Sequence, residues 1–114
     1  MKHTALLLGL FLFTTRVFAQ TISPTAASEH VGESVVVRGV VDEVHTSGHN
    51  NTFLDLGGKY PNQAFTGVIF SEYAGTFPGV HSVEGKTIDV SGAVQLYHGK
   101  PEIILRSAAQ LRVE

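Results

Sequence analysis

Apolar and polar residues alternate along several stretches of the chain, and this period of two predicts β-strands. Five such stretches are separated by segments rich in Gly, Ser, Asn and Pro, which favour turns. They are Glu33–Val44, Thr52–Gly57, Ala64–Phe70, Lys86–Tyr97 and Pro101–Val113. The pattern therefore predicts an all-β domain.

The alternation also assigns residues to the two faces of the predicted sheet, because successive side chains of a strand point to opposite sides. The residues expected to face a core are Leu54, Leu56, Phe65, Ile69, Ile88, Val90, Val94, Leu96, Ile103 and Leu105. Those expected to face outward on the second and third strands are Phe53, Asp55, Val68 and Phe70. The outer face of these two strands thus carries two aromatic residues and one acid.

Two of the long strands have a glycine near the middle, Gly39 and Gly92. An isolated glycine in a strand pattern indicates a bulge or a sharp bend, which a small barrel needs where its strands turn a corner. Ser71–Gly85 has no period of two, and we expect a short helix or turn there, with Phe77, Val80 and Val83 covering an open end of the sheet. These features predict a five-stranded Greek-key barrel, the OB-fold. An open β-sandwich or a different small barrel is the alternative.

The start of the chain has the pattern of a secretory signal peptide. A short polar start precedes the apolar run Ala5–Phe13, which is shorter than the roughly 20 residues that span a bilayer. A small residue, Ala19, marks the expected cleavage site. We expect residues 1–19 to be a signal peptide, 20–32 a flexible tether and 33–114 the domain. An uncleaved anchor or a core helix is the alternative for the apolar run.

Composition changes this picture in two respects. The chain has no cysteine, and a secreted chain without cysteine suits a bacterial periplasm better than a disulfide-dense secreted module. Cleavage would remove Lys2 and Arg16, leaving six basic and ten acidic residues and a formal net charge of −4. That balance counts against strong non-specific binding to nucleic acid, which depends on Lys and Arg. No membrane insertion is expected after cleavage, so we expect a periplasmic or secreted protein.

Two segments carry a resemblance to a known family: FLDLGGKYPNQAFTGVIF at residues 53–70 and EGKTIDVSGAVQLYHGKPEIIL at residues 84–105. The chain from about Gly32 to Val113 resembles a bacterial OB-fold family, similar to the OB modules of secreted nucleases and to nucleic-acid-binding OB domains of the tRNA-binding and helicase-associated types. The resemblance implies nucleic-acid binding on the second and third strands, between the loops that follow the first and fourth strands. These segments carry the fold more than any chemistry, so nuclease activity is not expected.

Binding of single strands without sequence preference requires aromatic side chains for base stacking and basic side chains near the phosphates. The candidates for this role are Arg38, Phe53, Lys59, Tyr60, Phe70, Tyr97 and Lys100. Asp55 beside Phe53 would repel phosphate. For Phe53 and Phe70 the alternative is burial under a loop, and for Tyr60 it is packing on Pro61.

The turn His98-Gly99-Lys100 joins the fourth and fifth strands. Gly99 suits the positive φ of a tight hairpin, and Lys100 is the residue of the turn best suited to contact a ligand. The alternative is that His98 and Lys100 are only a solvated hairpin tip.

Other chemistry has little support in the sequence. His45 and His49 are four residues apart, but in a glycine-containing loop, so a metal-responsive site there is only a minor hypothesis. The chain has no HExxH, EF-hand, GxSxG or P-loop pattern, so we expect no enzyme activity, no cofactor and no metal. The leading expectation is a binding module for single-stranded nucleic acid or a nucleotide-like ligand. The alternative is a periplasmic protein-interaction or stress-associated OB domain without a nucleic-acid role.

Overall fold

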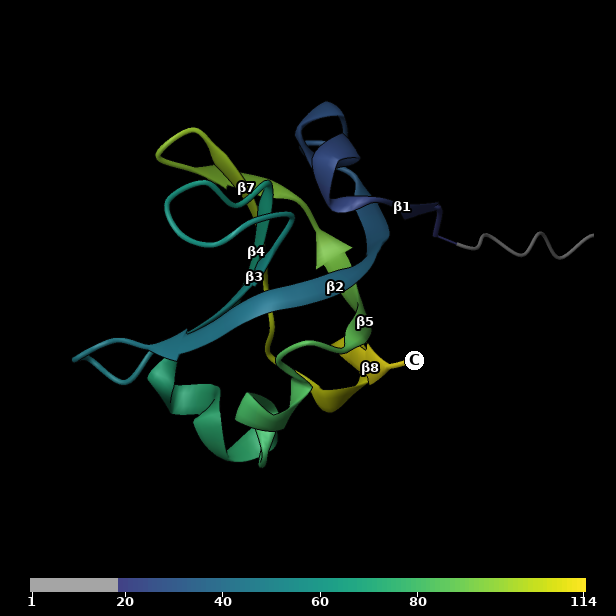
Figure 1. Cartoon of the computed structure of the whole chain (residues 1–114). Coiled ribbons are helices and arrows are strands. Elements are labelled where there is room, and N and C mark those ends of the chain that lie inside the picture. The colour runs from purple at the N-terminus through teal and green to yellow at the C-terminus, as the bar shows by residue number, and fades with distance from the viewer. Residues whose placement is uncertain (1–18) are drawn as a thin grey trace, which may run out of the picture.

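A computed structural model describes residues 19–114, and almost all of the predicted signal peptide lies outside the described residues (Figure 1). The strands are β1 (Thr21–Ile22), β2 (Ser34–Thr46), β3 (Thr52–Leu56), β4 (Phe65–Ile69), β5 (Thr87–Ala93), β6 (Gln95–Tyr97), β7 (Lys100–Ile104) and β8 (Leu111–Val113). Four 3₁₀ helices connect them: η1 (Pro24–Glu29), η2 (Ser71–Thr76), η3 (Val80–Val83) and η4 (Ala108–Gln110). Within the described residues, the predicted all-β class is confirmed, since strands predominate and the helices are short. No helix in residues 19–114 has the length and apolar character needed to cross a membrane.

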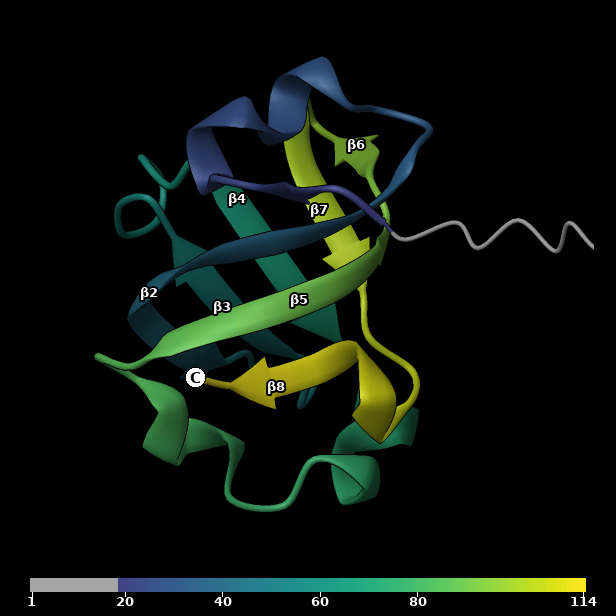
Figure 2. The ribbon, with the colours of Figure 1, turned by 90° about the vertical axis from the view of Figure 1, so that its right-hand side faces the viewer.

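The strands form one continuous hydrogen-bonded sheet in the order β6-β7-β4-β3-β2-β5-β8, with β1 added beside β2. The long strand β2 pairs with β5 along Ser34–Val40 and with β3 from Val41 onward. In Figure 2, β2 and β5 therefore cross in front of β3, β4 and β7. β4 and β7 are parallel, whereas β2–β3, β2–β5 and β3–β4 are antiparallel.

The structure divides the chain more finely than the five strands expected from the sequence. The predicted fourth strand is β5 followed by β6, with Val94 between them, and the predicted fifth is β7 followed by η4 and β8. The short helix or turn expected between the third and fourth strands is the pair η2 and η3. In the described residues, the sequence therefore located the main strands but missed β1 and the interruption at Val94.

The two mid-strand glycines allow close approach of other side chains. A Cβ atom on Gly92 would lie 2.7 Å from Ile103 Cγ2, and its φ of +150° is rarely adopted by other residues. A Cβ atom on Gly39 would lie 2.6 Å from Pro24 Cγ. β5 ends at Ala93, directly after Gly92, and the next strand, β6, pairs with β7 instead of β2. In β2 the irregularity lies between Val41 and Glu43, just beyond Gly39.

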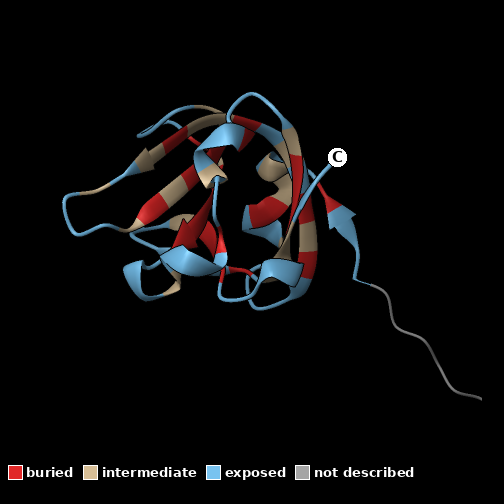
Figure 3. Ribbon diagram, turned by 90° about the horizontal axis from the view of Figure 1, so that it is seen from below, coloured by how far each residue is buried: buried red, intermediate tan, exposed pale blue. Residues whose placement is uncertain are grey.

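The core lies between the two parts of the folded sheet, where the buried positions in Figure 3 face one another. The expected core residues of β3, β4 and β7 are buried, as are Ile88, Val90 and Val94. Phe77 and Val83 are buried and Val80 packs against the core, as expected for residues that cover an end of the sheet.

One expected core residue lies outside the core. Leu96 was expected in the core but is 51% exposed, because β6 belongs to a hairpin that extends past the core. Val68 faces outward as expected, opposite Phe53, although it is buried there. Phe70, expected to face outward, is exposed.

The flexible tether expected at residues 20–32 is also wrong, because this segment packs onto the sheet. β1 pairs in parallel with β2, and the Val36 amide donates a hydrogen bond to the Gln20 carbonyl at 2.8 Å. Ile22 and Ala27 are buried in the core. A two-residue strand and a 3₁₀ helix have no long hydrophobic period, so the sequence pattern does not reveal them.

Candidate ligand-binding groove

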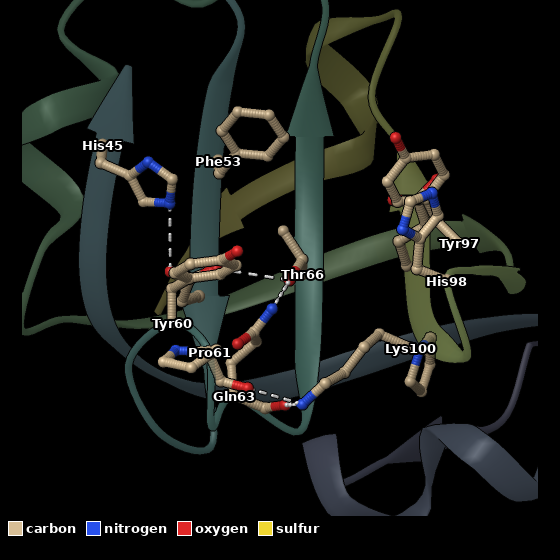
Figure 4. Close-up of a pocket in the computed structure, with 12 residues that line it drawn as sticks. His45, Phe53, Tyr60, Pro61, Gln63, Thr66, Tyr97, His98 and Lys100 are labelled. Atoms are coloured by element: carbon tan, nitrogen blue, oxygen red, sulfur yellow. Dashed lines mark hydrogen bonds and ion pairs between the residues drawn. The ribbon is translucent and has the colours of Figure 1, made fainter. Parts of the chain in front are cut away.

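A groove of about 430 Å³ lies on the outer face of β3, β4 and β7. Its walls come from two loops: Tyr60 and Pro61 from the β3–β4 loop, and Tyr97 and His98 from the β6–β7 hairpin (Figure 4). Its floor consists of strand residues, among them Asp55, Thr66 and Glu102. The groove is therefore on the face, and beside the hairpin, that the resemblance indicated.

Strand register gives the outer face of the sheet a polar row and an apolar row. Glu43 is opposite Asp55, Asp55 opposite Thr66, and Thr66 opposite Glu102, so these residues cross four strands side by side. The next residues on the same face lie two positions further along each strand. They form a second row, which consists of His45, Phe53, Val68 and Ile104. Alternate residues share a face, so the outer face carries buried acids next to an aromatic and aliphatic strip.

Asp55 is the most buried polar residue of the groove, at 1% exposure. The Thr66 hydroxyl donates a hydrogen bond to Oδ1 at 3.3 Å, and the Gln63 amide donates one to Thr66 at 3.2 Å. His45 Nε2 lies 3.3 Å from Oδ2. Burial raises the pKa of the Asp55 carboxyl above its ordinary range, while His45 and Thr66 oppose that rise. Burial of the ionised Asp55 carboxylate therefore lowers the stability of the folded protein.

Glu102 is a second buried carboxyl on the floor, 8% exposed. The Gln95 amide donates a hydrogen bond to its Oε2 at 2.7 Å. Burial raises its pKa, and the Gln95 hydrogen bond partly offsets this. Together with Asp55, it gives the floor an acidic character that counts against phosphate binding there.

We expect the substitution Asp55→Asn to stabilise the protein at neutral pH and to lose that advantage in acid. Between the ordinary pKa of about 4 and the raised value, the folded protein binds more protons than the unfolded chain, so acidification stabilises the wild type. Asn resembles the protonated acid but does not titrate, so the variant lacks this stabilisation by acid. The difference in stability between the two proteins can be measured by urea unfolding at several pH values between about 4 and 8. A stability difference that is constant across this range would contradict the assignment.

Three of the predicted aromatic residues meet at the groove. Phe53 stacks on His45 with ring centroids 5.0 Å apart, and Tyr97 stacks on His98 at 4.1 Å. Tyr60 and Tyr97 are 68% and 60% exposed, so their faces are accessible. Phe53 is only partly buried, and the alternative that it is covered by a loop is not what the structure shows.

The hairpin expected at His98-Gly99 is confirmed, with positive φ at both residues (+52° and +80°) as in a type I′ turn. Lys100 lines the groove, but its ammonium group is already engaged: Nζ donates hydrogen bonds to the carbonyls of Pro61 at 2.8 Å and Gln63 at 3.2 Å. These two hydrogen bonds give Lys100 a structural role, because they join the hairpin to the β3–β4 loop.

The other three candidates do not line the groove. Arg38 forms two hydrogen bonds with Asp89 of β5, at 2.7 and 3.0 Å. Lys59 is exposed on the turn beside Tyr60, and Phe70 is exposed at the start of η2. The structure thus brings Phe53, Tyr60, Tyr97 and Lys100 together and leaves Arg38, Lys59 and Phe70 outside.

Several groove residues do not stand out as candidates in the sequence: Gln63, Thr66, Pro101 and Glu102. Alternation along the third and fifth strands could have placed Thr66 and Glu102 on the face of Asp55. His45 was considered only as a metal ligand, yet it lies beside Asp55. In residues 19–114, no three metal-binding side chains come together, and His49 lies exposed on the β2–β3 loop.

The chain matches no protein-family model and no curated protein sequence. Solved structures do resemble it. A protein described as an aspartyl-tRNA synthetase from Leishmania major Friedlin has a TM-score of 0.56 at 15% identity, covering 99% of this chain and 26% of that one. The asparaginyl-tRNA synthetase from Pyrococcus horikoshii has a TM-score of 0.56 at 16% identity, covering 84% and 23%.

A smaller structure is similar over its whole length. It is OBody AM1L10, bound to hen egg-white lysozyme, with a TM-score of 0.57 at 16% identity over 88% of this chain and 98% of that one. The chain spans about a quarter of the length of the two synthetases. At these identities the likeness concerns the fold: this is a mostly-β domain of the OB type, as found in aminoacyl-tRNA synthetases.

Proposed function

We propose that the protein is a non-catalytic binding module that holds single-stranded nucleic acid, or a nucleotide-like ligand, in the groove of β3, β4 and β7. The observation that carries this proposal is the gathering of Phe53, Tyr60 and Tyr97 from three separate parts of the chain at one groove. Base stacking on such side chains contributes about 1–3 kcal/mol per base. The OB-type fold of the synthetase neighbours supports the same class of ligand.

Bases rather than phosphates would provide most of the affinity. The Lys100 ammonium is engaged by two carbonyl groups, and the floor carries the buried acids Asp55 and Glu102. Few counterions would be released from the nucleic acid, so the affinity should depend only weakly on salt.

We expect Tyr60→Ala and Tyr97→Ala each to weaken binding of a labelled single-stranded oligonucleotide by about 5- to 150-fold, the equivalent of one lost stacking contact. Both side chains are largely exposed, so the free energy of unfolding should change little. Fluorescence anisotropy at low salt measures the affinity, and urea unfolding verifies the fold.

Leu96→Ala is the matched control, because Leu96 is similarly exposed on the same strand as Tyr97 but does not line the groove. It should bind the oligonucleotide as the wild type does. Absence of binding by the wild type, even at low salt, would reject the proposed ligand.

A protein partner is the second candidate, and the acidic floor favours it. Asp55 and Glu102 would attract a basic side chain and repel phosphate. The OBody neighbour, which is bound to lysozyme, has the same fold. Isolating a stoichiometric partner whose binding is lost in Tyr97→Ala, in a protein that does not bind oligonucleotides, would support this candidate.

Two further points belong to the proposal. We infer that the sheet closes into a five-stranded barrel, since β5 and β6 together form one bent strand that pairs with β2 at one end and with β7 at the other. We also propose a periplasmic or secreted location, on the pattern of residues 1–19. Amino-terminal sequencing of the protein purified from cells should then begin at Gln20.

A further inference from the structure

The groove contains two buried hydrogen-bond acceptors without partners. Asp55 Oδ2 and Gln63 Oε1 are inaccessible to solvent and accept no hydrogen bond within residues 19–114. Their residues are 1% and 8% exposed, and both line the groove. Buried polar atoms are nearly always paired in native proteins, so a ligand that supplies hydrogen-bond donors would complete this groove.

Three donors already in the groove are directed to other partners. The Gln63 amide nitrogen is directed to Thr66, the Thr66 hydroxyl to Asp55 Oδ1, and the Lys100 ammonium to the backbone (Figure 4). His45 Nε2, 3.3 Å from Asp55 Oδ2, is within ion-pair range without a hydrogen bond. The two unsatisfied polar atoms are thus both acceptors. A ligand that complements them must present hydrogen-bond donors along the edge that faces them.

This requirement distinguishes the four bases, whose stacking faces are otherwise equivalent. On its Watson–Crick edge, guanine presents two adjacent donors, N1–H and the N2 amino group. Adenine and cytosine each place a ring-nitrogen acceptor beside their amino group, and thymine places its single N–H between two carbonyl groups. A carboxylate therefore pairs with guanine through two hydrogen bonds and meets a repelling acceptor on every other base.

Building on the proposed function, we propose that the groove selects guanine, with the Asp55 carboxylate accepting hydrogen bonds from N1–H and N2–H and Gln63 Oε1 accepting the second N2–H. The ring would lie against the aromatic walls. Asp55 Oδ2 is covered in this structure, so a wall side chain must turn outward on binding. Tyr60, which is 68% exposed with its ring 6.3 Å from that of His45, is the side chain placed to do so.

The test uses labelled oligothymidines of about 11 nucleotides, within the site size of one OB domain, that differ only in the central base. A single guanine avoids self-association of guanine-rich strands. The wild type should bind the central-guanine strand about tenfold more tightly than the other three, the discrimination typical of one bidentate contact. Asp55→Asn should bring the ratio of the affinities for the central-guanine and all-thymine strands close to one, whatever the removal of an acid from the floor does to the affinity for both strands.

Two further variants make the result specific. Gln63→Ala should reduce the preference for guanine in part, and it tests the same site if Asp55→Asn fails to fold. Glu72→Gln, which removes an exposed acid that does not line the groove, should keep the full preference.

The possible failures can be told apart. Equal binding of all four strands overturns guanine selection and leaves the proposed function standing. Absence of binding to every strand at low salt overturns both. Binding of an arginine-containing peptide that is abolished in Asp55→Asn, with no binding of oligonucleotides, would assign the acceptors to a cationic side chain and likewise overturn both.

Discussion

Phe65→Ala is expected to lower the free energy of unfolding by about 3–5 kcal/mol, the usual cost of removing a large aromatic side chain from a core. Phe65 begins β4 and is completely buried. A domain of this size has a total stability of about 5–15 kcal/mol, and the chain has no disulfide to compensate. Urea unfolding followed by circular dichroism should show a large fall in the midpoint at an unchanged slope.

Phe70→Ala is the control for this prediction. Phe70 lies five residues further along the chain, directly after β4, and is 39% exposed. Its removal should cost less than about 1 kcal/mol, as for most surface substitutions. Equal losses from the two variants would contradict the burial of Phe65 and the exposure of Phe70.

Gly92→Ala is expected to destabilise the domain by about 2–6 kcal/mol, which combines two effects. The backbone at φ +150° suits glycine, and other residues adopt such conformations at a cost of about 1–3 kcal/mol. The new Cβ atom would also lie 2.7 Å from Ile103 Cγ2, and overpacking of this kind costs about 1–3 kcal/mol. Because Gly92 precedes the bend into β6, the substitution should also displace the hairpin that carries Tyr97 and weaken ligand binding.

Gly48→Ala provides a comparison with the same chemical change. A Cβ atom on Gly48 would have no neighbour within 4 Å, and its φ lies outside the positive range. Its unfolding midpoint should equal or slightly exceed that of the wild type, because alanine restricts the unfolded chain. If both glycine variants unfold at the wild-type midpoint, the close contact between β5 and β7 at Gly92 is not as the structure describes.

The sequence predicted those parts of the fold whose residues alternate over a long stretch. Leu54 and Leu56 inside, with Phe53 and Asp55 outside, follow from the period of two alone. Leu96 has the same alternation but belongs to a hairpin that leaves the core, and a local pattern contains no information about where the core ends. β1 and η1 are too short to have a period.

Only the aromatic residues of the groove could be predicted from the sequence, because their role depends less on the partners that the fold brings to them. The aromatic residues Tyr60 and Tyr97 could be identified because they lie in or beside predicted turns. The roles of Arg38 and Lys100 could not, because a charged side chain takes the partner that the fold brings to it: Asp89 for Arg38, and two carbonyl groups for Lys100. The unpartnered acceptors of Asp55 and Gln63 depend in the same way on contacts that only the tertiary structure creates.

The hydrogen bonds of Lys100 have a consequence for how a ligand enters. They connect the hairpin to the β3–β4 loop, so the backbones of the two walls are held at a set separation before any ligand arrives. A preorganised site loses little conformational entropy on binding. Only side chains such as Tyr60 then have to adjust, and an exposed side chain does so within picoseconds to nanoseconds. Association should therefore be limited by diffusion and orientation rather than by a slow opening of the domain.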